Sequence, residues 1–378
     1  MGPLQGVKVV ELQGIGPGPF CGMMLADMGA EIIRVDRAGA VGNQANANDI
    51  LARGRKSIAV DLKHPEGVET VLRLVENADV LIEGFRPGVT ERLGLGPEVC
   101  LQRNPRLVYG RMTGWGQTGS MAHVAGHDIN YISLSGALHA MGEAGGKPVP
   151  PLNLVGDFGG GGMLLAFGIA AALFETSKSG CGQVIDAAMT DGSAILMNAV
   201  FGLMNSGRWA HERGTNLLDG GAHFYGTYAT KDGKYVSIGS IEPQFYALLL
   251  QKTGLDRVPD LPAQMSRKDW PLLQEKLTQV FLAKTRDEWD AIMLGTDICY
   301  APILDFDEAI SHPHNDARQT FVTQEGIRQA APAPRFSRTV AELPPGSVAP
   351  GAHTDEVLAT LGLSAADVQA LRARGAIA

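Results

Sequence analysis

The segment VKVVELQGIGPGPFCGMMLADMGAEIIRVD, residues 7–36, decides the fold. Its apolar start predicts a buried strand, the stretch at 20–30 predicts a helix that ends at Gly29, and residues 31–36 predict a second strand. A strand, a helix and a strand in so short a span form a βαβ unit, which joins parallel strands.

The same alternation continues along the chain. Further strand patterns lie at 57–62, 79–83 and 107–112, and helical patterns separate them. Repeated alternation favours an open, mostly parallel sheet with helices on both faces. We therefore predict an α/β protein whose first domain is built on such a sheet.

The pattern changes near residue 207, and 378 residues exceed what one core usually holds. Residues 225–240 read as a hairpin around the turn KDGK, and helical patterns follow. We expect a large domain over 1–206 that is completed by 331–378, a connector at 207–223, a small α+β domain at 224–320, and a return connector with C-terminal helices at 321–378.

The glycines of the first βα turn do not fit a nicotinamide site. Gly14, Gly16 and Gly18 alternate with Pro17 and Pro19, and proline lacks the N–H that a pyrophosphate would need. The last glycine of the dinucleotide fingerprint is replaced by Pro19. This turn therefore argues against nicotinamide binding.

Basic residues surround the third predicted strand, and they are Arg37, Arg53, Arg55, Lys56 and Lys63. A phosphorylated ligand would bind such a cluster at the carboxyl ends of parallel strands. An ordinary solvated surface would look the same in sequence. Both interpretations stay open, and Arg86 and Arg92 add charge after the next strand.

Residues 126–162 carry the candidate chemistry. His127 lies where an amphipathic helix is expected to start, and Asp157 lies just before GGGG and a long apolar run. A helix that begins after Asp157 would present free N–H groups to an oxyanion, and the glycines would leave that backbone open. An imidazole and a carboxylate on either side of one carbon suit proton transfer next to a carbonyl. Both residues could instead be simple helix caps.

Composition excludes several classes. A net charge of −8 argues against nucleic acid as the main partner. Four scattered cysteines have no metal-ligand spacing, and they suit a reducing compartment. The longest apolar run, residues 163–174, is too short to cross a bilayer, and the N-terminus has no signal-peptide pattern. We expect a cytoplasmic enzyme without a membrane span or a metal.

Several segments in one order resemble the family III CoA-transferases and, within that family, the racemases of 2-methylacyl-CoA thioesters. They cover almost the full chain and include ARGRKSIAVDLK (52–63), FRPGVTERLGLGP (85–97), GRMTGWGQTG (110–119), AGHDINYISLSG (125–136), NLVGDFGGGG (153–162) and EPQFY (242–246). The resemblance implies a large Rossmann-like domain and a small one in an interlocked homodimer, with each active site shared between subunits.

The resemblance also assigns residues. It implies that His127 and Asp157 exchange the α proton of a 2-methylacyl-CoA, with histidine acting on the S form and aspartate on the R form, and that Glu242 assists the histidine. It implies CoA contacts at Arg37, at Ala59, Val60, Asp61 and Leu62, and at Gly126, Asp128, Ile129, Asn130 and Tyr131, with Arg86 and Arg92 as weaker phosphate contacts. No cofactor is implied, because CoA is part of the substrate, and the natural acyl group stays open.

Two other functions remain to be weighed. A CoA transferase of the same fold would use Asp157 as a nucleophile and form an acyl anhydride. His127 and Glu242 favour the racemase over that alternative. A catalytically silent acyl-CoA-binding protein is the third possibility.

Overall fold

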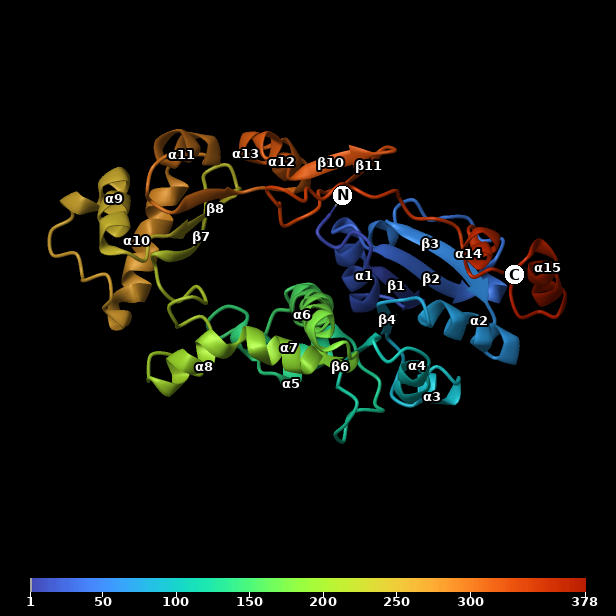
Figure 1. The fold of residues 1–378 in the computed structure, drawn as a ribbon. Helices are drawn as coiled ribbons and strands as arrows, with labels where there is room; N and C mark the ends of the chain where they lie inside the picture. The colour runs from blue at the N-terminus through green and yellow to red at the C-terminus, as the bar shows by residue number, and fades with distance from the viewer. Residues whose placement is uncertain (1) are drawn as a thin grey trace. The chain divides into compact units, whose positions relative to one another are not determined.

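A six-stranded parallel sheet is the centre of the first part of the molecule (Figure 1). The computed structural model describes residues 2–378. The strand order is β3-β2-β1-β4-β5-β6, with every neighbouring pair parallel. The strands are β1 (Lys8–Leu12), β2 (Glu31–Arg37), β3 (Arg55–Val60), β4 (Val80–Glu83), β5 (Val108–Thr113) and β6 (Gln183–Ala188).

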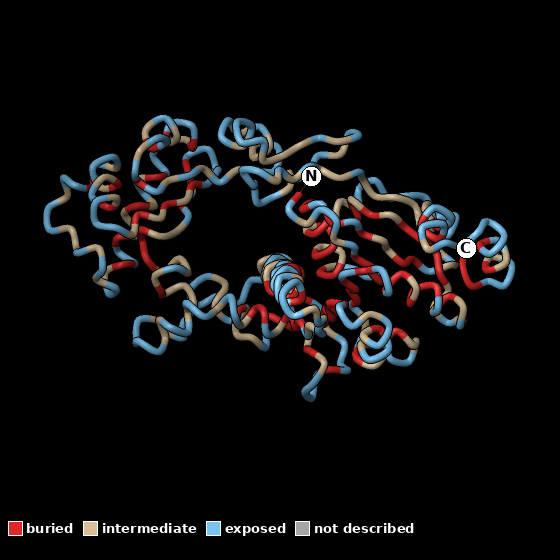
Figure 2. Tube along the Cα trace, in the orientation of Figure 1, coloured by how far each residue is buried: buried red, intermediate tan, exposed pale blue. Residues whose placement is uncertain are grey.

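Helices cover both faces of this sheet, and an apolar cluster lies between the sheet and the helices on each face. One cluster joins the sheet to α2 (Pro65–Val75), α4 (Pro97–Arg103), α14 (Thr354–Thr360) and α15 (Ala365–Ala373). The other joins it to α1 (Pro17–Asp27) and α6 (Leu164–Ser179). Figure 2 shows the buried backbone concentrated along the strands. The predicted doubly covered parallel sheet is confirmed.

Two boundaries differ from the sequence-based prediction. Helix α1 begins at Pro17 rather than in the segment after the prolines, because proline at the first helical position sacrifices no hydrogen bond. Gly16 precedes it with φ of 70°, a conformation that glycine adopts without strain. Strand β3 ends at Val60, so Asp61 and Leu62 lie in the turn that follows it.

The C-terminal segment returns to the first sheet and closes its edge. The backbone N–H of Ala59 donates to Thr354 Oγ1 at 3.1 Å, and the N–H of Ala378 donates to the carbonyl of Ala59 at 3.0 Å. The hairpin β10 (Phe321–Gln324) and β11 (Ile327–Ala330) belongs to the same compact unit. An edge strand covered in this way offers no template for pairing with another chain.

A second compact unit contains residues 136–151 and 197–317. Its sheet has the order β7-β8-β9, with β7 (Tyr225–Ala229) and β8 (Tyr235–Gly239) forming the predicted hairpin and β9 (Tyr300–Ile303) pairing antiparallel to β8. Its helices are α8 (Asn198–Asn205), α9 (Pro243–Thr253), α10 (Trp270–Leu282), α11 (Arg286–Met293), α12 (Phe306–Ser311) and α13 (Pro313–Ala317). By its contacts α8 belongs here, although its sequence position suggested the large domain.

The remaining short elements of the first unit are α3 (Val89–Arg92), α5 (Asp128–Leu134), α7 (Met189–Leu196) and η4 (Leu154–Met163), a π-helix that continues directly into α6. The combined helix Leu154–Ser179 could span a membrane by length and composition alone, and 33% of its most apolar window is buried within the protein. Core helices pass the same test, so this is weak evidence for a span.

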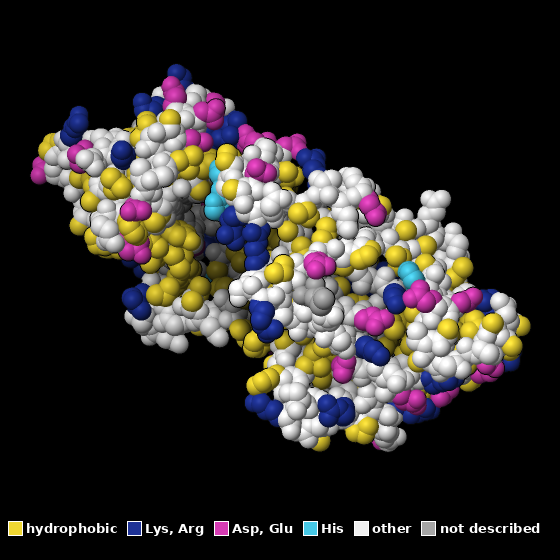
Figure 3. Space-filling view, turned by 45° about the horizontal axis from the view of Figure 1, so that its top comes forward, with side chains coloured by type: hydrophobic (Ala, Val, Ile, Leu, Met, Phe, Trp, Pro, Cys, Tyr) yellow, Lys and Arg dark blue, Asp and Glu magenta, His cyan; other side chains and the backbone are white. Residues whose placement is uncertain are grey.

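Acidic and basic side chains are interspersed on the face shown in Figure 3.

Candidate active site

A large open cavity lies where the strands of the parallel sheet end. Its volume is about 1840 Å³, and every residue that lines it belongs to the first unit. Both predicted bases, His127 and Asp157, line it. So do many of the predicted CoA contacts, namely Arg37, Val60, Asp61, Leu62, Arg86, Gly126, Asn130 and Tyr131.

His127 begins helix α5 as predicted. Its backbone is extended, and its N–H donates to Asn130 Oδ1 at 3.0 Å, which is one half of a capping box. The hydroxyl of Tyr131 donates to the carbonyl of Gly126, and the Tyr131 ring packs edge-on against Trp115 with centroids 4.7 Å apart. These contacts fix the backbone of His127 while its side chain stays exposed at the cavity.

The sequence pattern predicted that Asp157 would lie just before a helix, and the structure shows that this was wrong. It lies within the π-helix η4, whose N–H groups bond to carbonyls five residues earlier, as from Phe158 to Asn153 at 3.3 Å. The N–H groups after Asp157 are therefore used inside the helix and cannot serve an oxyanion. The N–H groups of Asp128 and Ile129, in the first turn of α5, have no acceptor among the described residues.

The glycines after Asp157 serve close packing rather than access. A Cβ on Gly160 would lie 2.5 Å from the backbone nitrogen of Ser193 on α7, and one on Gly162 would lie 2.5 Å from the carbonyl oxygen of Pro17 on α1. Both glycines are buried. Their lack of a side chain lets η4 lie against α1 and α7, and this is what brings Asp157 to the cavity.

The environment of Asp157 makes its carboxyl group easier to protonate than usual. Burial raises its pKa, a hydrogen bond from Asn153 Nδ2 at 3.2 Å lowers it, the charge of Asp128 raises it, and that of His127 lowers it. The net shift is upward. A carboxyl group with a raised pKa can return a proton as well as remove one.

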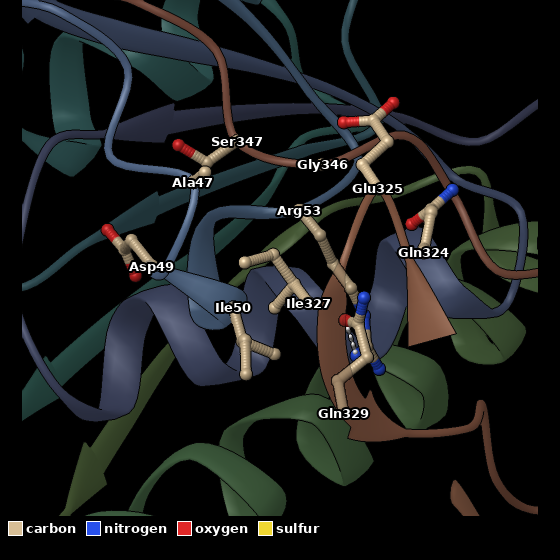
Figure 4. Close-up of a pocket in the computed structure, with 10 residues that line it drawn as sticks. All are labelled: Ala47, Asp49, Ile50, Arg53, Gln324, Glu325, Ile327, Gln329, Gly346 and Ser347. Atoms are coloured by element: carbon tan, nitrogen blue, oxygen red, sulfur yellow. Dashed lines mark hydrogen bonds between the residues drawn. The ribbon is translucent and has the colours of Figure 1, made fainter. Parts of the chain in front are cut away.

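Two residues of the basic cluster are structural. Arg55 is bonded through Nη2 to Glu11 Oε2 at 2.9 Å, and Arg53 is bonded through Nη2 to Asp27 Oδ2 at 2.5 Å. All four side chains are buried. Figure 4 shows Arg53 beside Gln329, to whose Oε1 it donates at 2.7 Å, in a small cavity of about 30 Å³. Lys56 is paired with Glu356 on the exposed side at 2.9 Å. None of the three lines the large cavity.

Arg37, Lys63 and Arg86 are the exposed cations at the large cavity. The loop that carries Arg86 is held by buried Glu83, whose carboxylate accepts from the N–H of Phe85 at 2.7 Å and from Arg111 Nε at 2.8 Å. Sequence reasoning missed Glu83 and Arg111, because a strand-end acid and a mid-strand arginine carry no pattern of their own. Arg92 and Ala59, two predicted CoA contacts, do not line the cavity.

Asp128 and Ile129, also predicted as CoA contacts, do not line the cavity either. The Asp128 side chain is buried, and its Oδ1 accepts the backbone N–H of Asp157 at 2.7 Å. Ile129 is 45% exposed. The first residues of α5 therefore point in different directions.

Glu242 lies in the second unit, as the residue that precedes α9. Its side chain is exposed and makes no capping hydrogen bond. Burial and then the charge of Glu242 raise the pKa of the Cys299 thiol. The assignment of Glu242 as the acid that assists His127 stays a prediction.

Comparison with known proteins identifies the family. Residues 4–354 match the CoA-transferase family III. The chain is 50% identical to alpha-methylacyl-CoA racemase of Mus musculus over 368 residues, an alignment that covers 97% of this chain and 95% of that protein. It is 47% identical to alpha-methylacyl-CoA racemase of Homo sapiens over 371 residues, which covers 97% of this chain and 96% of that protein. A CAIB/BAIF family protein from Brucella suis has a similar structure, with a TM-score of 0.81 and 26% identity over 95% of this chain and 99% of that one. The chain therefore belongs to the CoA-transferase family III.

Proposed function

We propose that this protein is a racemase that interconverts (2R)- and (2S)-2-methylacyl-CoA thioesters. The observation that carries the proposal is that His127 on α5 and Asp157 on η4 line one cavity at the carboxyl ends of the parallel strands. The two relatives that are about half identical to this chain over nearly its full length are alpha-methylacyl-CoA racemases.

Inversion at the α carbon requires one base on each face of the planar enolate. His127 would remove the proton from the S form and Asp157 from the R form, and the other residue would return a proton in each case. The raised pKa of Asp157 suits it to both roles.

The proposed step is a proton transfer and needs neither a redox cofactor nor a metal, since CoA enters as part of the substrate. Arg37, Lys63 and Arg86 provide positive charge at the cavity for the CoA phosphates. Turnover should therefore survive dialysis against a chelator.

Two copies of the chain would complete the active site, with Glu242 of one subunit serving the cavity of the other. Support comes from the apolar exposed face of α6, where Phe167 and Phe174 are 71% and 63% exposed. Light scattering at micromolar concentration should give twice the chain mass, and a monomer would contradict this assembly. A cytoplasmic location is our prediction.

The proposal is tested by incubating the protein with (2R)-2-methylacyl-CoA in heavy water. Configuration and α-deuterium content are followed together. Loss of optical purity with deuterium gain and no second acid supports the racemase. Asp157→Asn should remove inversion and leave acyl-CoA affinity nearly unchanged.

The alternative is a CoA transferase, the activity for which the family is named. In that case Asp157 would attack the thioester carbon, expel the CoA thiolate and form an acyl anhydride. CoA transfer to an added free acid without α exchange, and a hydroxamate formed at Asp157 by hydroxylamine, would establish that chemistry and overturn the racemase.

A further inference from the structure

Asp128 follows directly after His127, but its side chain turns away from the cavity. It is only 7% exposed, and its Oδ1 accepts the backbone N–H of Asp157 at 2.7 Å. Its second oxygen, Oδ2, is buried and has no hydrogen-bond partner among the described residues. A buried carboxylate that is only partly satisfied is costly, so its presence here calls for a reason.

The helix that carries Asp157 lacks a cap of its own. Asn153 precedes η4 without a capping side-chain bond, so the first N–H groups of the π-helix have no partner within it. The carboxylate of Asp128 satisfies the N–H of Asp157 from a neighbouring helix. It thereby caps η4 at the residue whose side chain would do the chemistry.

Gly156 provides independent support for this contact. A Cβ at position 156 would lie 2.4 Å from Asp128 Oδ1 and 3.2 Å from Ile132 Cγ2. Any other residue would push Asp128 away from the N–H of Asp157. The glycine before Asp157 therefore has a specific role, which is to admit the Asp128 carboxylate.

We propose that Asp128 is a positioning residue for Asp157, whose backbone N–H it caps and beside whose carboxyl group it holds a second negative charge. This inference rests on the proposed function of Asp157 as a base. The cap fixes the backbone of the base, and the neighbouring charge makes the base bind its proton more tightly.

The groups around Asp157 come from several elements. Helix α5 brings His127, Asp128 and Tyr131. Burial and then the charge of Asp157 raise the pKa of Tyr131, and the charge of Arg86 lowers it. Helix α1 carries two titratable groups, the buried thiol of Cys21, whose pKa burial raises, and Asp27, which is bonded to Arg53. The charged residues on the other packed elements are exposed or paired, and they are Asp191 on α7, Asp186 on β6, Glu175 and Lys178 on α6, and Arg111 on β5.

The test compares Asp128→Asn, which keeps an oxygen acceptor and loses the charge, with Asp128→Ala, which loses both. Loss of the α proton from the R substrate rises with pH as Asp157 ionises. In Asp128→Asn this acid limb should move to lower pH, because the neighbouring negative charge is gone, with a rate within about tenfold of the wild type. In Asp128→Ala the rate should fall about 100-fold, because the base is no longer held in place.

A second readout does not depend on activity. Amide hydrogen exchange, resolved by peptide, should lose protection around residues 154–163 in Asp128→Ala and in Gly156→Ala, and should keep it in Asp128→Asn. Asp186→Asn is the matched control, because Asp186 also accepts a backbone N–H, that of Gln117 at 3.0 Å, and its charge is not among the causes of the raised pKa of Asp157. It should leave the acid limb and the protection of 154–163 unchanged.

An acid limb that stays in place in Asp128→Asn would overturn the proposal. The proposal would also be overturned if Asp128→Ala kept wild-type amide protection at residues 154–163 and removed the α proton of the substrate at the wild-type rate. If the wild type itself exchanged no α proton with either enantiomer, the proposed function would fail, and the amide protection would still decide whether Asp128 caps η4.

Discussion

Arg53 and Arg55 lie on the same stretch of sequence as Lys63, yet they belong to a different chemical environment. The two arginines are 3% and 4% exposed, and each is bonded to a buried carboxylate. Lys63, like Arg37 and Arg86, is exposed at the large cavity. Basic residues that are clustered in the sequence therefore divide in the fold into buried ion pairs and exposed side chains at the cavity.

The difference follows from position along the strand. Arg53 precedes β3 and Arg55 is its first residue, so both start from the amino end of that strand. Their side chains reach inward to Asp27 at the end of α1 and to Glu11 on β1. Residues that follow the strands lie at the carboxyl end, where ligands bind in open α/β sheets. Buried cations should therefore affect stability, and exposed ones should affect binding.

The largest expected effect is on stability. Arg55→Leu leaves Glu11 buried without a partner and should lower the free energy of unfolding by about 3–5 kcal/mol, measured by urea denaturation. The double variant Glu11→Leu with Arg55→Leu removes both charges and should recover most of that loss. Equal losses in the single and double variants would show that packing, not charge, is what Arg55 contributes.

Arg86→Ala should act on binding. Loss of one charge-assisted contact contributes about 1.5 kcal/mol, so KM for acyl-CoA should rise about tenfold with kcat nearly unchanged. The free energy of unfolding should change by less than about 0.5 kcal/mol. Arg106→Ala, an exposed arginine away from the cavity, is the control, and a similar rise in its KM would mean that only the overall charge matters.

The pH dependence of stability sharpens the comparison at Asp27. Burial raises the pKa of Asp27 despite the hydrogen bond and the charge of Arg53. The folded state therefore takes up this proton at a higher pH than the unfolded state does. As the pH falls from 7 toward 4, the wild type should gain stability relative to Asp27→Asn, measured by urea denaturation at each pH. A constant difference between the two proteins would contradict the raised pKa.

Lys56 should show the smallest effect. Its side chain is 39% exposed, and it pairs with Glu31 at 3.4 Å and Glu356 at 2.9 Å in contact with solvent. Lys56→Met should lower the free energy of unfolding by no more than about 0.5 kcal/mol, and less at high salt. A loss as large as that of Arg55→Leu would remove the distinction between buried and exposed cations.

Much of the fold could be predicted because strands and helices carry local patterns. The βαβ start, the parallel sheet and the hairpin of β7 and β8 each depend on periodicity and turn residues within a few positions. The helix start at His127 was predictable for the same reason. Asp157 was misplaced because a π-helix has no sequence pattern of its own and forms here through packing of η4 against α1 and α7.

The sequence by itself determined the order of strands and helices, the residue types available for proton transfer, and the membership of the family, since all of these depend on local pattern and matched motifs. Tertiary structure alone decided which arginines are paired with buried carboxylates, and it placed Asp128 so close to position 156 that a side chain there would displace it. It also decided that Asp128 turns toward Asp157. Those outcomes depend on contacts between residues far apart in the chain, where burial sets the cost of a charge and the partner is chosen by the fold.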